Sequence, residues 1–187
     1  MNKLVLAAAL LALAGPACAQ NAPAAQSDKS QTASAATQNF AKTAAMTDIF
    51  EIQAGQLAQQ KADDPAYKDF AQMTINDHTK TTEQLKGMSL AGVTLPQELD
   101  SAHKAKIDKL SGLNGAAFER QFKADQVAGH KQAVALFERY AKSGDNPDLK
   151  TWAQNTLPTL KTHLQHAEAL PRPGAAPTTG SGASSHR

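Results

Sequence analysis

Two short joints of similar composition divide most of the chain into helical segments. Asp63-Asp64-Pro65 and Asp145-Asn146-Pro147 each follow one long stretch of apolar residues at helical spacing and precede another. In each joint an Asp or Asn side chain is suited to cap a helix, and the proline after it is suited to the first helical position. Joints this short place consecutive helices side by side and antiparallel. The predicted helices span residues 38–62, 65–88, 114–142 and 147–170.

A long connection, residues 89–114, separates the two predicted hairpins. It has a short helical pattern of its own over residues 97–110 and is long enough to run the length of a helix bundle. No stretch of the chain alternates like a β-strand. We therefore predict an all-α domain over residues 38–170, a ferritin-like four-helix bundle whose two antiparallel hairpins are joined by a long connector containing a short helix. The alternative is an up-down-up-down bundle with a decorated loop.

The first 19 residues have the pattern of a secretory signal peptide. Lys3 gives a positive start, residues 4–14 form an apolar run, and Ala17-Cys18-Ala19 is a small-residue cleavage site. We expect cleavage after Ala19 and a periplasmic or secreted location. A retained anchor is disfavoured because the apolar run is too short to span a bilayer. Lipid attachment at Cys18 is disfavoured because Gly15-Pro16 does not fit a lipobox.

Two stretches outside the predicted domain lack apolar periodicity. Residues 20–37 are rich in Ala, Gln, Ser and Thr, and residues 171–187 are rich in Pro, Gly, Ser and Ala. Such compositions bury too little apolar surface to fold. We predict a disordered tether before the domain and a disordered tail after it.

The charged residues are balanced and dispersed, with 19 Lys and Arg against 17 Asp and Glu. They form no basic block of the kind that binds nucleic acid or a membrane surface, and no apolar segment after the leader is long enough to span a membrane. The only cysteine lies in the leader, and the chain has no nucleotide-binding glycine motif or nucleophile elbow. We therefore predict no nucleic-acid partner and no transmembrane segment in the mature chain, and we find little support for an enzyme.

Four titratable residues interrupt the apolar faces of the long predicted helices. They are Glu51, His78, His130 and His163, one on each helix. In an antiparallel hairpin, residues equidistant from the turn lie level, which pairs Glu51 with His78 and His130 with His163. These pairs lie about 20 Å and 25 Å from their joints, near the middle of helices about 36 Å long. We therefore predict that the four side chains converge on one central polar layer.

This layer has two interpretations, provided that the two pairs coincide. In the first, one carboxylate and three imidazoles hydrogen-bond with one another and set the register of the helices, since buried polar groups need partners. In the second, the same four side chains bind one divalent transition metal such as Zn, Cu, Ni, Mn or Fe. Asp77, beside His78, and His166, one turn after His163, are candidates for supporting or additional ligands. The alternative for both is a surface role.

Several segments between residues 40 and 170 resemble a family of secreted bacterial proteins. The matching segments are FAKTAAMTDIFEIQAGQLAQQKA, YKDFAQMTINDH, LPQEL, KIDKL, FERQFKADQVAGHKQAVALF and LKTWAQNTLPTLKTHLQHAEAL. The family is the domain of unknown function 4142, often labelled "predicted outer membrane protein". The resemblance implies a ferritin-like four-helix bundle in the cell envelope, and no established activity. It also implies a set of characteristic polar residues, which are Glu51, Asp77, His78, His130 and His163.

Two functional hypotheses follow. The first is a non-enzymatic envelope protein whose surface serves stress protection or interaction with an envelope protein partner. The second is a mononuclear metal-binding or metal-dependent redox protein that uses the central layer. A di-iron site is disfavoured because such bundles place a glutamate three residues before each ligand histidine, and Ile75 and Leu160 occupy those positions here. The sequence sets neither a substrate nor an oligomeric state.

The leader generates a testable prediction. Because Ala17 and Ala19 occupy the small-residue positions of the cleavage site, we expect the mature protein to begin at Gln20. Intact-mass measurement of protein recovered from the periplasm should give the mass of residues 20–187. A lipid-modified Cys18 at the N-terminus would contradict the prediction.

Overall fold

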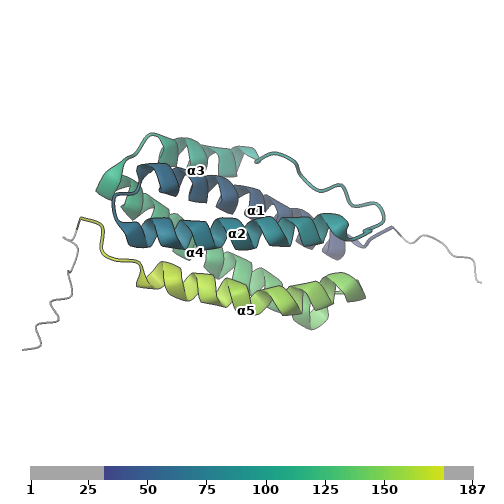
Figure 1. Ribbon diagram of the computed structural model, residues 1–187. Coiled ribbons are helices and arrows are strands. Elements are labelled where there is room, and N and C mark those ends of the chain that lie inside the picture. Colours follow the sequence, from purple (N-terminus) through teal and green to yellow (C-terminus); the bar gives the residue numbers. More distant parts are fainter. Residues whose placement is uncertain (1–31, 175–187) are drawn as a thin grey trace, which may run out of the picture. The chain divides into compact units, whose positions relative to one another are not determined.

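The described part of the chain, residues 32–174 of a computed structural model, contains five helices and no β-strand (Figure 1). The helices are α1 (Ala35–Lys61), α2 (Pro65–Gly87), α3 (Ser101–Ser111), α4 (Gly115–Ser143) and α5 (Pro147–Ala169). The predicted all-α class is thus confirmed for these residues. Among them, no helix combines the length and the apolar character that crossing a membrane requires. The predicted leader with Cys18, most of the predicted tether, and the tail beyond residue 174 lie outside the described residues.

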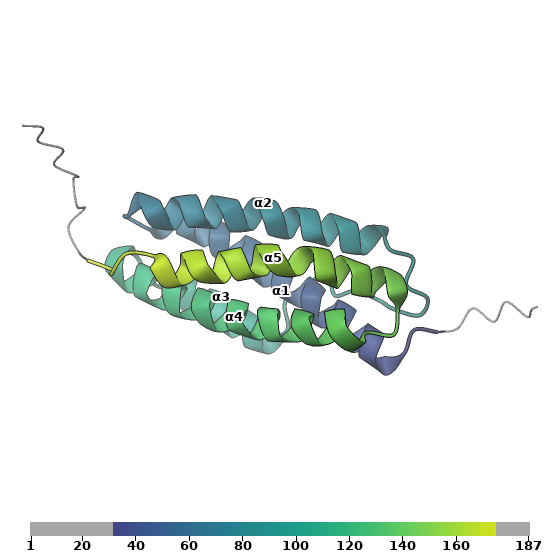
Figure 2. The same cartoon turned by 90° about the horizontal axis from the view of Figure 1, so that it is seen from below.

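The helices form two antiparallel hairpins, α1–α2 and α4–α5, which pack against each other (Figures 1 and 2). α1 lies beside α4, α2 lies beside α5, and the short α3 lies against α1 and α4. α2 ends where α1 begins, and residues 88–114 return along the bundle through α3 to the other end, where α4 begins (Figure 1). The two tight joints therefore lie at opposite ends of the bundle.

Both tight joints have the predicted caps. Asp64 Oδ1 accepts a hydrogen bond from the Ala66 N–H (2.9 Å), and Asn146 Oδ1 accepts one from the Leu149 N–H (2.9 Å). A proline follows each cap at the start of α2 and of α5. Each cap satisfies a backbone N–H that the first helical turn leaves without a partner, and the proline has no N–H to satisfy.

The first helix begins at Ala35, earlier than the predicted start at residue 38. Ser34 caps it by accepting a hydrogen bond from the Thr37 N–H (3.0 Å). Thr37 is buried, and its hydroxyl is hydrogen-bonded to the hydroxyl of Tyr140 and to the carboxylate of Asp145. The end of the predicted tether therefore belongs to the packed domain, because these hydrogen bonds attach it to the second hairpin.

A layer of buried polar residues divides the apolar core into two clusters. One cluster includes Phe40, Phe137, Tyr140 and Trp152. The other, towards the opposite end of the bundle, includes Tyr67, Phe70, Phe118 and Phe122. The buried polar residues between them are Asp48, Glu51, Thr74, His78, Gln126, His130, Thr156 and His163. The layer therefore has more members than the four residues that were predicted from the sequence.

Another buried acid, Glu119 on α4, joins the two hairpins at the α1–α2 joint. Glu119 is 3% exposed, and its Oε1 accepts hydrogen bonds from the backbone N–H groups of Asp63 (2.9 Å) and Asp64 (2.8 Å). Its negative charge also lies near the N-terminus of α2, where the helix dipole favours an anion. Glu119 thus supplies from a neighbouring helix the acceptor that these two N–H groups need.

Replacing this acceptor should destabilise the fold measurably. We expect Glu119→Ala to lower the free energy of unfolding by about 2–3 kcal/mol, because two partly buried backbone N–H groups lose a charged acceptor. The control is Glu138→Ala on the same helix, which removes an exposed ion pair with Lys161 (2.7 Å) and should cost less than about 1 kcal/mol. Urea unfolding monitored by circular dichroism measures both losses. Equal losses in the two variants would contradict the structural role of Glu119.

Candidate metal centre

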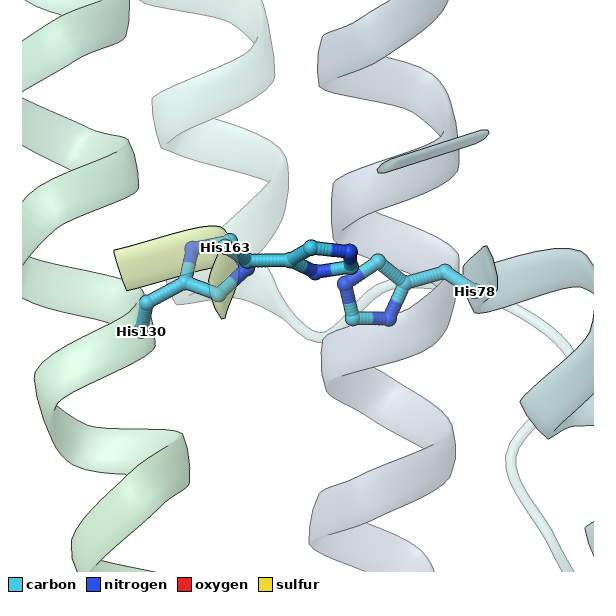
Figure 3. A group of neighbouring side chains, drawn as sticks. All are labelled: His78, His130 and His163. Atoms are coloured by element: carbon cyan, nitrogen blue, oxygen red, sulfur yellow. The ribbon is translucent and has the colours of Figure 1, made fainter. Parts of the chain in front are cut away.

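Three imidazole rings meet in the middle of the bundle (Figure 3). His78 on α2 is 2% exposed, and His130 on α4 and His163 on α5 are each 1% exposed. Their ring centroids lie 5.3–5.8 Å apart. One nitrogen from each ring lies within 4.8 Å of those of the other two. The structure thus brings together three of the four residues that were predicted to form the layer.

Two of the rings are held by carboxylates, each through one ring nitrogen. His78 Nδ1 lies 2.8 Å from Asp48 Oδ1. His163 Nε2 lies 2.8 Å from Asp77 Oδ2 across the α2–α5 interface. An ionised carboxylate only accepts hydrogen bonds, so both of these ring nitrogens are donors.

The third ring is held by the backbone of its own helix. His130 Nδ1 lies 2.9 Å from the carbonyl oxygen of Gln126, which also only accepts. All three rings, when neutral, therefore carry their proton on the nitrogen that makes the hydrogen bond. The remaining ring nitrogens are buried and have no hydrogen-bond partner; they are His78 Nε2, His130 Nε2 and His163 Nδ1.

These three unpartnered nitrogens determine what the layer can do chemically. In neutral rings each of them has a lone pair, and the three rings that carry these lone pairs meet in a buried space. A buried polar atom without a partner costs about 1–3 kcal/mol. A cation among the rings, either a proton on one of them or a metal ion, reduces this cost.

Glu51, the fourth predicted member of the layer, lies beside this cluster. It is 1% exposed, its Oε2 accepts a hydrogen bond from Gln126 Nε2 (2.6 Å), and its Oε1 lies 4.0 Å from His130 Nδ1. The predicted pairing of Glu51 with His78 is therefore replaced by a pairing with Gln126 and His130. The close group of candidate ligand atoms in the described residues consists of the three imidazoles.

Asp48 takes the place beside His78, and the sequence analysis missed it. Besides the hydrogen bond from His78, Asp48 Oδ2 accepts hydrogen bonds from the hydroxyls of Thr81 (3.0 Å) and Thr82 (3.1 Å). These three donors fix the carboxylate against the ring. The sequence contains a signal that could have identified Asp48 as a partner of His78. Asp48 lies three residues before Glu51 on the same helix, and it lies level with Thr81 across the first joint.

The two candidate supporting residues have different positions. Asp77 is partly exposed and holds His163, as described above. His166 lies on the surface, one turn further along α5, with its Nδ1 3.4 Å from Met73 Sδ. His166 is therefore not part of the three-histidine cluster.

The three rings differ in their affinity for protons. Burial, repulsion by His78 and proximity to His130 lower the pKa of His163 to about 4, against the opposing effect of Asp77. Burial also lowers the pKa of His130, although the charge of Glu51 opposes this shift. Burial acts in the same direction on His78, but the hydrogen bond and charge of Asp48, with the charges of Glu51 and Asp77, outweigh it and raise the pKa. A proton taken up by the metal-free layer therefore binds His78 before the other two rings.

The residues of the layer fit a metal ion. Three imidazoles are a known ligand set for zinc, with bonds of about 2.0–2.1 Å. Tetrahedral ligands at that distance lie about 3.3 Å apart, so nitrogens within 4.8 Å of one another require each ring to move inward by less than about 1 Å. The acceptors on the other ring nitrogens are the partners that fix the tautomer and orientation of metal-binding histidines.

The described residues thus define an all-helical domain with a buried cluster of three histidines. The chain belongs to the family described as Domain of unknown function (DUF4142), whose model matches residues 21–170, and the predicted resemblance is confirmed. Among solved structures, the chain is similar to the crystal structure of a DUF305 fragment from Deinococcus radiodurans, with a TM-score of 0.64 and 16% sequence identity over 74% of this chain and 97% of that chain. At this identity the similarity shows the fold alone. No curated protein matches the sequence.

The lowered pKa values make the metal-free protein sensitive to acid. Below the unfolded value of about 6.5 the unfolded chain binds protons that His130 and His163 do not bind in the fold, so stability should fall as the pH drops from 6.5 towards the pKa of His163 near 4. The raised pKa of His78 stabilises the fold in acid, and this contribution is already complete below the unfolded value. We expect His163→Gln to reduce the loss by up to about 1.4 kcal/mol per pH unit.

Urea unfolding at pH 6.5 and pH 4.5, in the presence of a chelator, measures this dependence. His166→Gln is the matched control, because the exposed ring lies one turn along the same helix and should leave the pH dependence unchanged. If the free energy of unfolding falls equally in wild type and in His163→Gln between the two pH values, His163 binds a proton in the fold as readily as in the unfolded chain. That outcome would contradict the prediction.

Proposed function

We propose that the protein holds one divalent transition-metal ion between His78, His130 and His163, within a ferritin-like four-helix bundle of the cell envelope. The observations that support this function are that one nitrogen of each of the three rings lies within 4.8 Å of those of the other two, and that each ring has one buried nitrogen without a hydrogen-bond partner. In the alternative hydrogen-bond network, the imidazoles and Glu51 would satisfy one another. Here one nitrogen of each ring donates a hydrogen bond to an acceptor outside the cluster. The other nitrogen of each ring keeps a lone pair that a cation can use.

The charges around the rings favour a divalent ion. Asp48 and Glu51 are 5% and 1% exposed, and their ion-pair partners among the described residues are the imidazoles of His78 and His130. Buried carboxylates need compensating positive charge, because an uncompensated buried charge is costly. A divalent ion bound to neutral rings supplies two positive charges, whereas a single proton on His78 supplies one.

The helix arrangement supports a ferritin-like bundle with a mononuclear centre. Two antiparallel hairpins joined by one long connection are typical of ferritin-like folds, whose metal sites lie between facing helices (Figure 1). Ile75 and Leu160 stand where a di-iron site would have glutamates three residues before the histidines. The envelope location in this proposal rests on the predicted leader and on the family resemblance.

The burial of the rings favours a role in holding the metal over the conversion of a substrate. A catalytic metal site keeps one coordination position open, and substrate or water must be able to reach it. The three histidines are enclosed between two apolar clusters and are at most 2% exposed. We therefore propose a metal-binding protein whose ion stabilises or is stored in the bundle, with Glu51 contributing its charge beside His130.

A metal titration tests the proposal. Protein purified without a histidine tag should take up one equivalent of Zn²⁺ per chain, measured in competition with a chromophoric chelator and confirmed by elemental analysis. His78→Gln, His130→Gln and His163→Gln should each weaken binding by more than about 100-fold, because each removes a ligand. His103→Gln, on the surface of α3, should leave the affinity unchanged. Absence of uptake, or equal affinity in His163→Gln and His103→Gln, would refute the proposal.

The acceptors behind the rings provide a second readout in the same titration. We expect Asp48→Asn and Asp77→Asn to weaken Zn²⁺ binding by about 10–100-fold, because the hydrogen-bonded carboxylate orients the ring and raises its basicity. Glu83→Gln, on an exposed part of α2, is the matched control and should have no such effect. Circular dichroism of the metal-free variants separates loss of metal binding from loss of folding.

A further inference from the structure

A methionine and a histidine meet on the surface where α2 and α5 pack together. Met73 precedes Asp77 by one turn of α2, and His166 follows His163 by one turn of α5. Met73 Sδ and His166 Nδ1 lie 3.4 Å apart. The pair therefore lies one helical turn along the interface from the hydrogen bond between Asp77 and His163, outside the three-histidine cluster.

The two side chains line a cleft of about 410 Å³. The rest of its lining is largely apolar and comes from α2 and from the end of α5: Ala66, Asp69, Phe70, Ala169, Leu170 and Pro171. Met73 is half-buried and His166 is exposed, and both line the cleft. Asp69 adds one carboxylate to the cleft, which favours cations.

The hydrogen bond between these two atoms is a weak one. A thioether sulfur is a weak acceptor, and an exposed imidazole can use water for both of its nitrogens. An apolar residue such as leucine at position 73 would line the cleft equally well. The pairing of a thioether with an imidazole in a partly apolar cleft instead matches a ligand set for a soft ion.

We propose that Met73 and His166 form a surface site for monovalent copper, separate from the buried three-histidine centre. Thioether and imidazole ligands select Cu(I) over hard cations such as Mg²⁺ or Ca²⁺. An ion between the two atoms requires them to separate by roughly 1 Å, at ordinary metal–nitrogen and metal–sulfur distances of about 2.0 and 2.3 Å. The exposed ring of His166 can make this movement by a change of rotamer. The apolar walls of the cleft exclude part of the water that would compete for the ion.

The test is an anaerobic Cu(I) titration of the full chain carrying His130→Gln, which disables the buried centre. Binding is measured in competition with a chromophoric Cu(I) chelator and by NMR of ¹³C-methyl-labelled methionine. We expect one equivalent to bind and the methyl signal of Met73 to shift, while those of Met46 and Met88 remain in place. Met73→Leu and His166→Gln should each weaken binding at least about tenfold, which corresponds to about 1.4 kcal/mol.

The controls are Met88→Leu and His103→Gln, which replace the same residue types elsewhere in the bundle and should leave Cu(I) binding unchanged. Absence of Cu(I) uptake, or equal affinity in Met73→Leu and Met88→Leu, would overturn the proposal. A shift of Met73 that requires an intact His130 would also overturn it, since the site would then not be independent. Because the buried centre is disabled here and is tested with Zn²⁺, failure of either proposal is distinguishable from failure of the other.

Discussion

Three neutral imidazole rings packed inside an apolar bundle set the conditions that the rest of the structure must meet. Each ring has one donor and one acceptor, and in a dry interior both need partners. The donors are satisfied by Asp48, by Asp77 and by the Gln126 carbonyl. These partners fix the tautomers, so all three acceptors remain on the other side of the rings. The three ring nitrogens therefore lack partners as a result of the hydrogen bonds that hold the rings.

The acceptors bring their own requirement, because Asp48 and Glu51 are themselves buried. Asp48 is satisfied by a ring and two threonine hydroxyls, and Glu51 by the Gln126 side chain. Gln126 thus serves the layer twice, since its amide donates to Glu51 and its carbonyl accepts from His130. Hydrogen bonds orient these groups but supply little positive charge. A cation among the rings completes the electrostatics that the hydrogen bonds leave unbalanced.

The sequence was sufficient to predict the helices and the level of the histidines, because both depend on local signals and on regular geometry. The joints at Asp64-Pro65 and Asn146-Pro147 define where the helices turn, and equal distances from a joint then identify residues that lie level. Equal distance from the joint did not identify Asp48 as the partner of His78. That rule pairs His78 with Glu51, whereas the ring is hydrogen-bonded to Asp48, about one turn away on the same helix. Which of two acids on one helix reaches a ring depends on side-chain direction and helix rotation, which spacing alone does not give.

Two other features depended on tertiary contacts that no local pattern shows. Ser34 caps α1 within a run rich in Ala, Gln, Ser and Thr, and the hydroxyl of Thr37 in the same run is hydrogen-bonded to Tyr140 and Asp145 of the second hairpin. Glu119 lies next to Arg120 in a segment that could equally be a solvated face, and its burial depends on the α1–α2 joint packing against α4. In both cases a polar residue satisfies backbone or side-chain groups of another hairpin.

The proposed ligand set would also link metal binding to the association of the two hairpins. His78 belongs to the first hairpin, whereas His130 and His163 belong to the second, so one ion bound by all three would connect them. An ion that binds only the folded state stabilises it by about 2.7 kcal/mol at a hundredfold excess over its dissociation constant. The unpaired nitrogens raise the free energy of the metal-free fold, while the unfolded chain hydrates its imidazoles freely. Apolar residues in their place would stabilise the metal-free bundle and remove this dependence. Under the proposed function, retaining three histidines therefore lowers the stability of the metal-free bundle and increases the part of the stability that a bound ion would provide.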